Sequence, residues 1–237
     1  MSNDCLCHVL SYLDPFSDLA LAQRVSRAWR TCGRETERLY VQRLTLDDRA
    51  SKVCVPLAVL DRWKQRLMAI DVVVQLRSSD VMPLLEYCGA HLTSLRIDAP
   101  FYLKMGLPCM PRLRRLTVLR GTVYTKWLAQ VLPAIRVLNL GAYHSYDAIQ
   151  WLVQRHQATE LRECTLRLRS WQADSLIEEL GCALKVGACP ALDVLHMEVV
   201  GPTELHHKRR TLLEEVRSWP AKTTTVTWTR IWTAATL

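Results

Sequence analysis

The sequence predicts an α/β protein in which a three-helix module, residues 1–40, precedes a short, irregular solenoid of parallel strands and outer helices, residues 41–237. Three observations predict this fold class. Leucines and similar residues recur at helical spacing near the start, a strand-like pattern returns every 21 to 31 residues, and segments with helical periodicity lie between those strands. The final strand is expected to cap the solenoid.

The bulk composition is that of an ordinary globular protein. Of the 237 residues, 49% are apolar and 23% are charged, which argues against a disordered chain. No apolar run is long enough for a membrane span, and Asp4 stands where a targeting signal would carry basic residues. We expect a cytoplasmic protein, with nuclear or ciliary locations as alternatives. The formal charge of +8 favours acidic partners or a weak affinity for nucleic acid.

The chain carries no recognisable catalytic or cofactor motif. It lacks a Gly-x-Ser-x-Gly, a His-Glu-x-x-His and a phosphate-binding glycine loop, so we expect no enzyme activity and no cofactor. Its nine cysteines include no Cys-x-x-Cys pair, which predicts thiols in a reducing compartment and not a disulfide framework. The neighbouring His206 and His207 alone make no metal site, so we predict no bound metal.

The predicted N-terminal module consists of short helices joined by tight turns. Apolar residues share helical spacing in the first of them: Leu6, Val9, Leu10 and Leu13. Asp14-Pro15 ends this helix. A second helix is predicted from Ser17 to a C-cap at Gly33, and a third over residues 34–40.

The repeat section shows the pattern apolar-x-x-apolar-x-apolar, which places three side chains inside a coil of chain. The clear examples have as middle residues Leu95, Leu116, Leu138, Cys164 and Leu195, and the weaker ones have Leu44, Ile70 and Val226. The helical segments expected to form the outer wall are 81–88, 127–132, 148–156, 174–184 and 203–219. Because helices return the chain, consecutive strands are expected to lie parallel.

The strand spacing suits irregular leucine-rich repeats, and an ordinary doubly wound α/β domain is the alternative. A doubly wound domain usually has longer crossovers and glycine-rich turns, and this chain has only 8 glycines. Leucine-rich repeats often carry Asn or Cys at a ninth position, which ties successive turns together. Here that position falls on Pro100, Gly121, Tyr143, Arg169 and Val200. No such ladder is therefore expected.

Residues 4–30 resemble the F-box, a three-helix module that many family members follow with leucine-rich repeats; they read DCLCHVLSYLDPFSDLALAQRVSRAWR. The matching residues are Leu6, Val9, Leu10, Leu13, Asp18, Leu19, Val25, Ser26, Arg27 and Trp29. The resemblance implies binding to the small S-phase-kinase-associated adaptor of cullin-RING ubiquitin ligases, while the repeats hold a target.

Docking of a short helical bundle requires exposed apolar side chains that fit a groove or facing helices. The candidates for this partner-binding face are Leu6, Val9, Leu10, Leu13, Pro15 and Leu19. The alternative is that several of them only pack against Val25, Trp29 and the first repeat.

A second candidate surface is the inner face of the predicted strands, where side chains alternate with the buried positions. The candidates are Arg96, Arg115, Asn139, Arg167 and His196. Its arginines suit a carboxylate-bearing or phosphorylated protein target through forked hydrogen bonds. The alternative is a solvated sheet face with no binding role.

The leading hypothesis is a non-catalytic F-box subunit that recruits substrates to a cullin-RING ubiquitin ligase, with the F-box-binding adaptor and the cullin scaffold as partners. The alternative is a structural subunit of a large assembly, such as an axonemal linker complex of the nexin-dynein regulatory type. In that case the same modules serve only to dock neighbouring subunits. Neither hypothesis involves a membrane.

Overall fold

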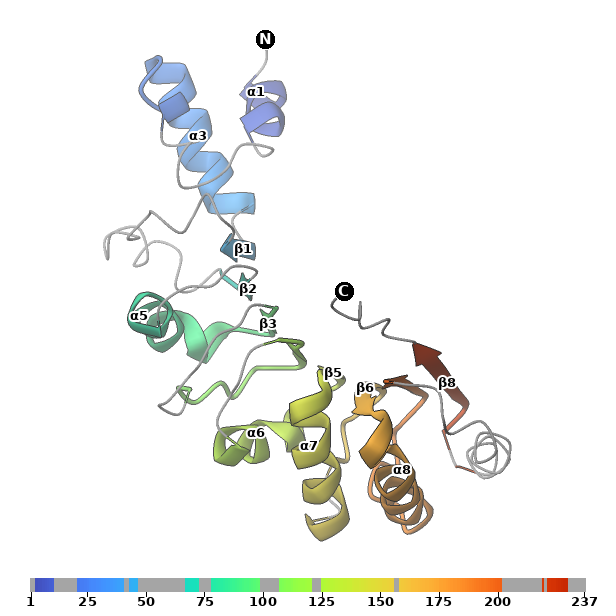
Figure 1. Ribbon diagram of the computed structural model, residues 1–237. Helices are drawn as coiled ribbons and strands as arrows, with labels where there is room; N and C mark the ends of the chain where they lie inside the picture. Colours follow the sequence, from blue (N-terminus) through green and yellow to red (C-terminus); the bar gives the residue numbers. More distant parts are fainter. Residues whose placement is uncertain are drawn as a thin grey trace, which may run out of the picture. The chain divides into compact units, whose positions relative to one another are not determined.

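A computed structural model describes residues 3–10, 21–40, 43–46, 67–72, 78–98, 107–120, 125–155, 158–201, 219 and 221–229 (Figure 1). The chain divides into two compact units. The first comprises Met1–Ala99 and Pro108–Arg112, and the second comprises Pro100–Leu107 and Leu113–Leu237. The domain boundary predicted after residue 40 lies inside the first unit and stays a prediction.

The first unit begins with two described helices, α1 (Asn3–Leu10) and α3 (Arg27–Tyr40), which pack against each other. The predicted single helix from Ser17 to Gly33 is wrong, and so is the separate third helix, because one helix runs through Gly33. The chain turns at residues 23–25, and the Ser26 hydroxyl then accepts a hydrogen bond from the Trp29 amide at 3.1 Å. This bond satisfies an amide that the first helical turn leaves unpaired.

Position 33 of α3 is a glycine, and the Gln23 side chain occupies the space that a larger side chain would need. A Cβ atom at this position would come within 2.5 Å of the Gln23 side chain. A glycine inside a helix costs about 1 kcal/mol relative to alanine, which is why the sequence predicted that the helix ends at Gly33. The helix continues instead, and the glycine allows the preceding turn to approach it closely.

The first unit also contains the parallel strands β1 (Arg43–Leu46), β2 (Ala69–Val72) and β3 (Ser94–Ile97). Helix α5 (Ser78–Cys88) and the short helix η2 (Gly89–His91) connect β2 to β3. The middle residues predicted for these strands, Leu44, Ile70 and Leu95, lie opposite one another and are buried. The predicted register of these strands is confirmed.

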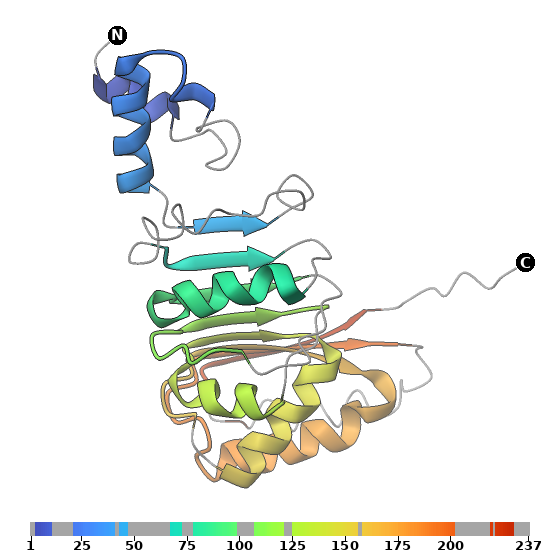
Figure 2. The same cartoon turned by 90° about the vertical axis from the view of Figure 1, so that its left-hand side faces the viewer.

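The second unit contains the strands β4 (Arg115–Val118), β5 (Val137–Leu140), β6 (Glu163–Arg169), β7 (Val194–Val200) and β8 (Thr223–Thr229). Each described strand pairs in parallel with the next along the chain, as Figure 2 shows. This sequential order lacks the reversal of strand order that defines a doubly wound sheet. The unit is a mixed α/β structure, and its assignment to leucine-rich repeats stays a prediction.

The described helices of the second unit are α6 (Thr125–Val131), η3 (Leu132–Ala134), α7 (Ala142–Arg155) and α8 (Ser170–Lys185). The helical segments predicted at 148–156 and 174–184 fall almost entirely within α7 and α8, which begin several residues earlier. The segment predicted at 203–219 lies outside the described residues, apart from Trp219. None of the described helices has the length and apolar character needed to cross a bilayer.

Helices α7 and α8 lie side by side on one face of strands β5, β6 and β7 (Figure 1). The core between them and the sheet is made of aliphatic side chains: Leu138, Leu140, Leu166, Leu168, Ile149 and Ile177. The leucines among them alternate along β5 and β6 with mostly polar residues, because successive side chains of a strand point to opposite faces. The polar residues therefore lie on the face opposite α7 and α8.

Strand β8 departs from the predicted register. We expected Val226 at the level of Leu195, but Thr224 lies opposite Leu195 and Val226 lies opposite Met197. A shift of two residues keeps every side chain on its predicted face, so the alternating pattern alone cannot fix it. The start of the strand is set instead by an ion pair between Lys222 and Asp193 at 2.6 Å, and by the Thr223 amide, which donates to the Asp193 carbonyl.

Candidate functional site

Four of the five predicted inner-face residues lie on the polar face of the second unit. Arg115 is on β4, Asn139 on β5, Arg167 on β6 and His196 on β7, and each alternates with buried neighbours. Asn139 and His196 flank Thr165 at the same level of the sheet. We call this surface the polar face. The binding role of these residues stays a prediction.

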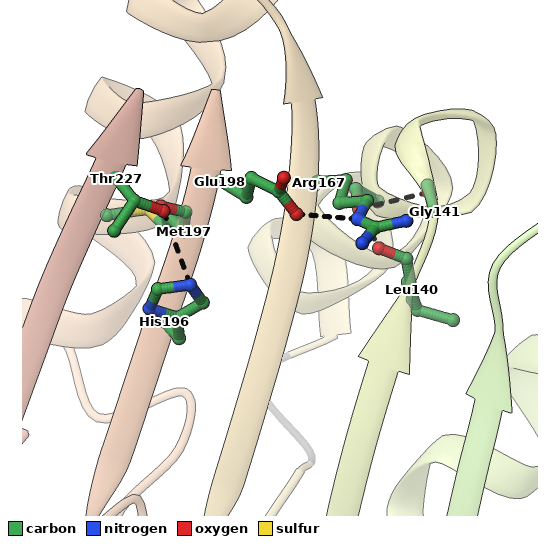
Figure 3. Close-up of polar contacts among 8 residues, drawn as sticks. Leu140, Gly141, Arg167, His196, Met197, Glu198 and Thr227 are labelled. Atoms are coloured by element: carbon green, nitrogen blue, oxygen red, sulfur yellow. Dashed lines mark hydrogen bonds and ion pairs between the residues drawn. The ribbon is translucent and has the colours of Figure 1, made fainter. Parts of the chain in front are cut away.

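An ion pair on the polar face joins adjacent strands. The Arg167 guanidinium donates through Nε to Glu198 Oε2 at 2.6 Å, and both side chains are partly exposed (Figure 3). This pair neutralises one of the two arginines predicted to receive an anionic partner in this unit. An incoming carboxylate would have to compete with Glu198 for Arg167.

His196 is held by two threonines of β8. Its Nδ1 lies 2.6 Å from Thr225 Oγ1, and its Nε2 lies 3.3 Å from Thr227 Oγ1. A neutral imidazole donates through one nitrogen and accepts at the other, so both ring nitrogens are engaged. His196 therefore links β8 to β7 through both of its ring nitrogens.

Arg96, the fifth predicted residue, belongs to the first unit. It lies on β3 and pairs with Asp98 at 2.7 Å. In register it stands opposite Asp71 of β2, whose side chain is buried. Two acidic neighbours make Arg96 a weaker receptor for an anion than its sequence position indicated.

The N-terminal helices form a small core of their own. Leu6 and Leu10 are buried with Ala22 and Cys32 between α1 and α3, and Cys7 and Trp29 pack against them. The prediction placed Leu6 and Leu10 on an exposed docking face, but in the free chain both are buried, and Leu10 has no exposed surface. Their partner-binding role stays a prediction. Leu13, Pro15 and Leu19 lie outside the described residues.

Other apolar side chains are exposed on this module. Val9 of α1 is 50% exposed, and Leu21 and Val25, which precede α3, are 59% and 66% exposed. Val9 was among the predicted docking residues. Val25 was named only in the alternative, as a residue that the docking candidates pack against, and Leu21 was not among the candidates. The sequence carried no signal for either exposure, because residues 23–25 were predicted to continue a helix and form a turn instead.

Half of the cysteines that the structure describes are buried and behave as small apolar side chains. Burial raises the pKa of Cys88 to about 11 and that of Cys189 to about 12, and it raises the pKa of Cys164 further. In α3, burial and the neighbouring Cys7 raise the pKa of Cys32. These four thiols stay protonated near neutral pH and are poor nucleophiles.

A group of residues that the sequence reasoning passed over lies where strands β5 and β6 lead into helices. Tyr143 and Trp171 are each the second residue of a helix, in α7 and α8, and both are largely exposed. The guanidinium carbon of Arg169 lies 4.4 Å from the centre of the Tyr143 ring. Tyr143 and Arg169 occupy the ninth positions of successive repeats. That shared position was the one sequence feature that could have indicated that they lie close together.

Within the segments that the structure describes, no three His, Cys, Asp or Glu side chains come together as metal ligands.

Comparison with known proteins adds one finding. No curated protein matches the chain. The family model described as F-box-like matches residues 3–45, the stretch that holds α1, α3 and most of β1. The chain therefore contains an F-box-like domain at residues 3–45, followed by a mixed α/β region with parallel strands.

Proposed function

We propose that this protein is a non-catalytic adaptor, and more specifically a subunit that recruits substrates to a cullin-RING ubiquitin ligase. The observation that carries the proposal is the F-box-like domain at residues 3–45. F-box domains generally bind the small S-phase-kinase-associated adaptor, which joins them to the cullin. The remainder of the chain is then available to hold a target.

The exposed apolar residues of the module support a docking role. Val9, Leu21 and Val25 expose about half or more of their surface, although the module already buries Leu6 and Leu10 in its own core. Apolar side chains that are left exposed beside a formed core are typical of surfaces that a partner covers. In this proposal Val9, Leu21 and Val25 contact the adaptor, and Leu6 and Leu10 hold the helices that present them.

The experiment is a binding measurement between the full chain and the purified adaptor by isothermal titration calorimetry. We expect Val9→Asp and Leu21→Asp each to weaken binding, since each places a charge where apolar contact is needed. Val186→Asp is the matched control, because Val186 is equally exposed but lies at the end of α8 in the second unit. Failure of the unaltered chain to bind the adaptor would overturn the ligase proposal.

Leu10→Asp is unsuitable for this test, since a charge at a fully buried position disrupts the module itself. A second measurement is purification of the complex from native cells. Stoichiometric adaptor and cullin support the ligase role. Their absence beside a fixed set of structural subunits would replace it with the axonemal linker alternative.

A further inference from the structure

The aromatic edge, which we define as Tyr143, Arg169 and Trp171, is held in a fixed position by the turns beneath it. Between β5 and α7 there is only Gly141, whose added Cβ would come within 2.1 Å of the Leu119 carbonyl oxygen. The buried Ser145 hydroxyl lies 3.2 Å from the carbonyl oxygens of Leu140 and Gly141. These contacts fix the start of α7 against the sheet.

The start of α8 is equally confined. Ser170 is buried and faces Gly201, where an added Cβ would come within 2.1 Å of the Ser170 hydroxyl oxygen. Gly201 has a φ of +153°, a conformation that other residues rarely adopt. The aromatic edge therefore sits on rigid turns, and a partner that binds it loses little freedom of the protein.

The two aromatic side chains of the edge are more exposed than is usual for tyrosine and tryptophan. Tyr143 is 70% exposed and Trp171 is 72% exposed, although rings of this size are mostly buried in folded proteins. Tyrosine, tryptophan and arginine are the residues most enriched where binding energy concentrates in protein interfaces. All three types occur together here within two neighbouring strand-to-helix turns.

The charge of the edge is positive. Arg169 stacks on Tyr143, and among the described residues it has no carboxylate partner, in contrast to Arg167, which is paired with Glu198. Neither α7 nor α8 carries an acidic residue in its first turn. A guanidinium held flat by a ring keeps its outer N–H groups directed away from the protein, where they fit a carboxylate.

We propose that the aromatic edge binds an acidic peptide segment of the target protein, with a carboxylate on Arg169 and an apolar side chain against Tyr143 and Trp171. This inference rests on the proposed function, since it names the class of substrate that this protein would recruit to the ligase. A nucleic acid fits less well because the edge offers a single unpaired guanidinium, and Glu163 and Glu198 lie on the adjacent polar face.

The test uses the immobilised full chain and a library of random peptides displayed on phage. We expect enrichment of sequences in which Asp or Glu lies next to an aromatic or leucine residue. The enriched peptides, made synthetically with a fluorescent label, should bind Arg169→Gln and Trp171→Ala at least about tenfold more weakly. Their affinity should also fall as the salt concentration rises.

Matched controls separate the edge from general surface effects. Arg136→Gln changes an exposed arginine that lies just before β5 and pairs with Glu160. Val186→Ala shortens an exposed apolar residue at the other end of α8. Both controls should bind the peptides as the unaltered chain does. Arg169→Lys keeps the charge but loses the flat stacked group, so an intermediate loss is expected.

Several results would overturn the proposal. One is a screen that enriches no acidic peptides, and another is equal peptide binding by the edge variants and the controls. A third is a complex between the unaltered chain and a poly(U) oligonucleotide that the edge variants fail to form. Self-association that disappears in Trp171→Ala, measured by analytical ultracentrifugation, would assign the edge to a second copy of the chain. The edge variants should leave adaptor binding unchanged, so failure of peptide binding and failure of adaptor binding are distinguishable.

Discussion

Arg167 on β6 and Glu198 on β7 form an ion pair across adjacent strands, with 2.6 Å between Nε and Oε2. Their side chains are partly exposed, and exposed pairs of this kind stabilise proteins by about 0 to 1 kcal/mol. In a double-mutant cycle with Arg167→Ala and Glu198→Ala, measured by urea denaturation, we expect a coupling energy below about 1 kcal/mol. A coupling of several kcal/mol would mean that the pair is desolvated far more than its exposure indicates.

Gly141→Ala is expected to destabilise the second unit. The added methyl group would meet the Leu119 carbonyl, which belongs to the backbone and cannot turn aside. Overpacking of this kind costs about 1 to 3 kcal/mol in the free energy of unfolding. The measurement is thermal or urea denaturation of the full chain followed by circular dichroism.

The control for that prediction is Gly187→Asn. Gly187 has a φ of +86° and nothing near its side-chain position, and asparagine tolerates this conformation better than other residues. We expect a cost below about 1 kcal/mol. Equal effects at the two glycines would show that backbone conformation, and not the close approach to Leu119, accounts for the loss at Gly141.

Leu10→Ala and Val9→Ala should differ sharply although the residues are neighbours in α1. Leu10 is fully buried in the α1–α3 core and Val9 is half exposed. Truncating a buried leucine costs about 2 to 5 kcal/mol, whereas exposed truncations are usually within about 0.5 kcal/mol. Hydrogen exchange of residues 3–10 and 27–40 in the full chain measures the difference. Comparable exchange in both variants would contradict the described packing.

The contact between Asp193 and Lys222 predicts a pH dependence at the start of β8. A hydrogen bond from Lys222 lowers the pKa of the Asp193 carboxyl in the folded protein. Its stabilisation is therefore fully present above the unfolded pKa of about 3.9 and is lost as the pH falls through the lower folded value. Hydrogen exchange of residues 223–229 should be slower in the unaltered chain than in Asp193→Asn at neutral pH. The two should converge in acid.

Thiol alkylation provides a separate test of the core. Cys164 and Cys189 are buried and burial raises the pKa of both, whereas Cys5 and Cys109 are exposed. We expect iodoacetamide to modify Cys5 and Cys109 in the native protein and to reach Cys164 and Cys189 only after unfolding, as read by mass spectrometry. Rapid native modification of Cys164 would show that β6 does not face the core as described.

The local pattern of apolar residues was enough to place the parallel strands. Leu116, Leu138, Cys164 and Leu195 follow the pattern apolar-x-x-apolar-x-apolar, and those on β5, β6 and β7 lie opposite their predicted partners. This was possible because burial on one face imposes a period of two that the chain carries locally. The F-box-like segment was likewise readable, since its matching residues lie close together in the chain.

The contacts between these segments could not be predicted from the local pattern and are known from the fold. The passage of α3 through Gly33 depends on Gln23, and the register of β8 depends on Asp193, each from a different part of the chain. The ring of Tyr143 meets Arg169 because two tight turns bring the helix starts to one edge of the sheet. A local pattern specifies which face a side chain occupies, but its neighbour on that face is chosen by packing between distant segments.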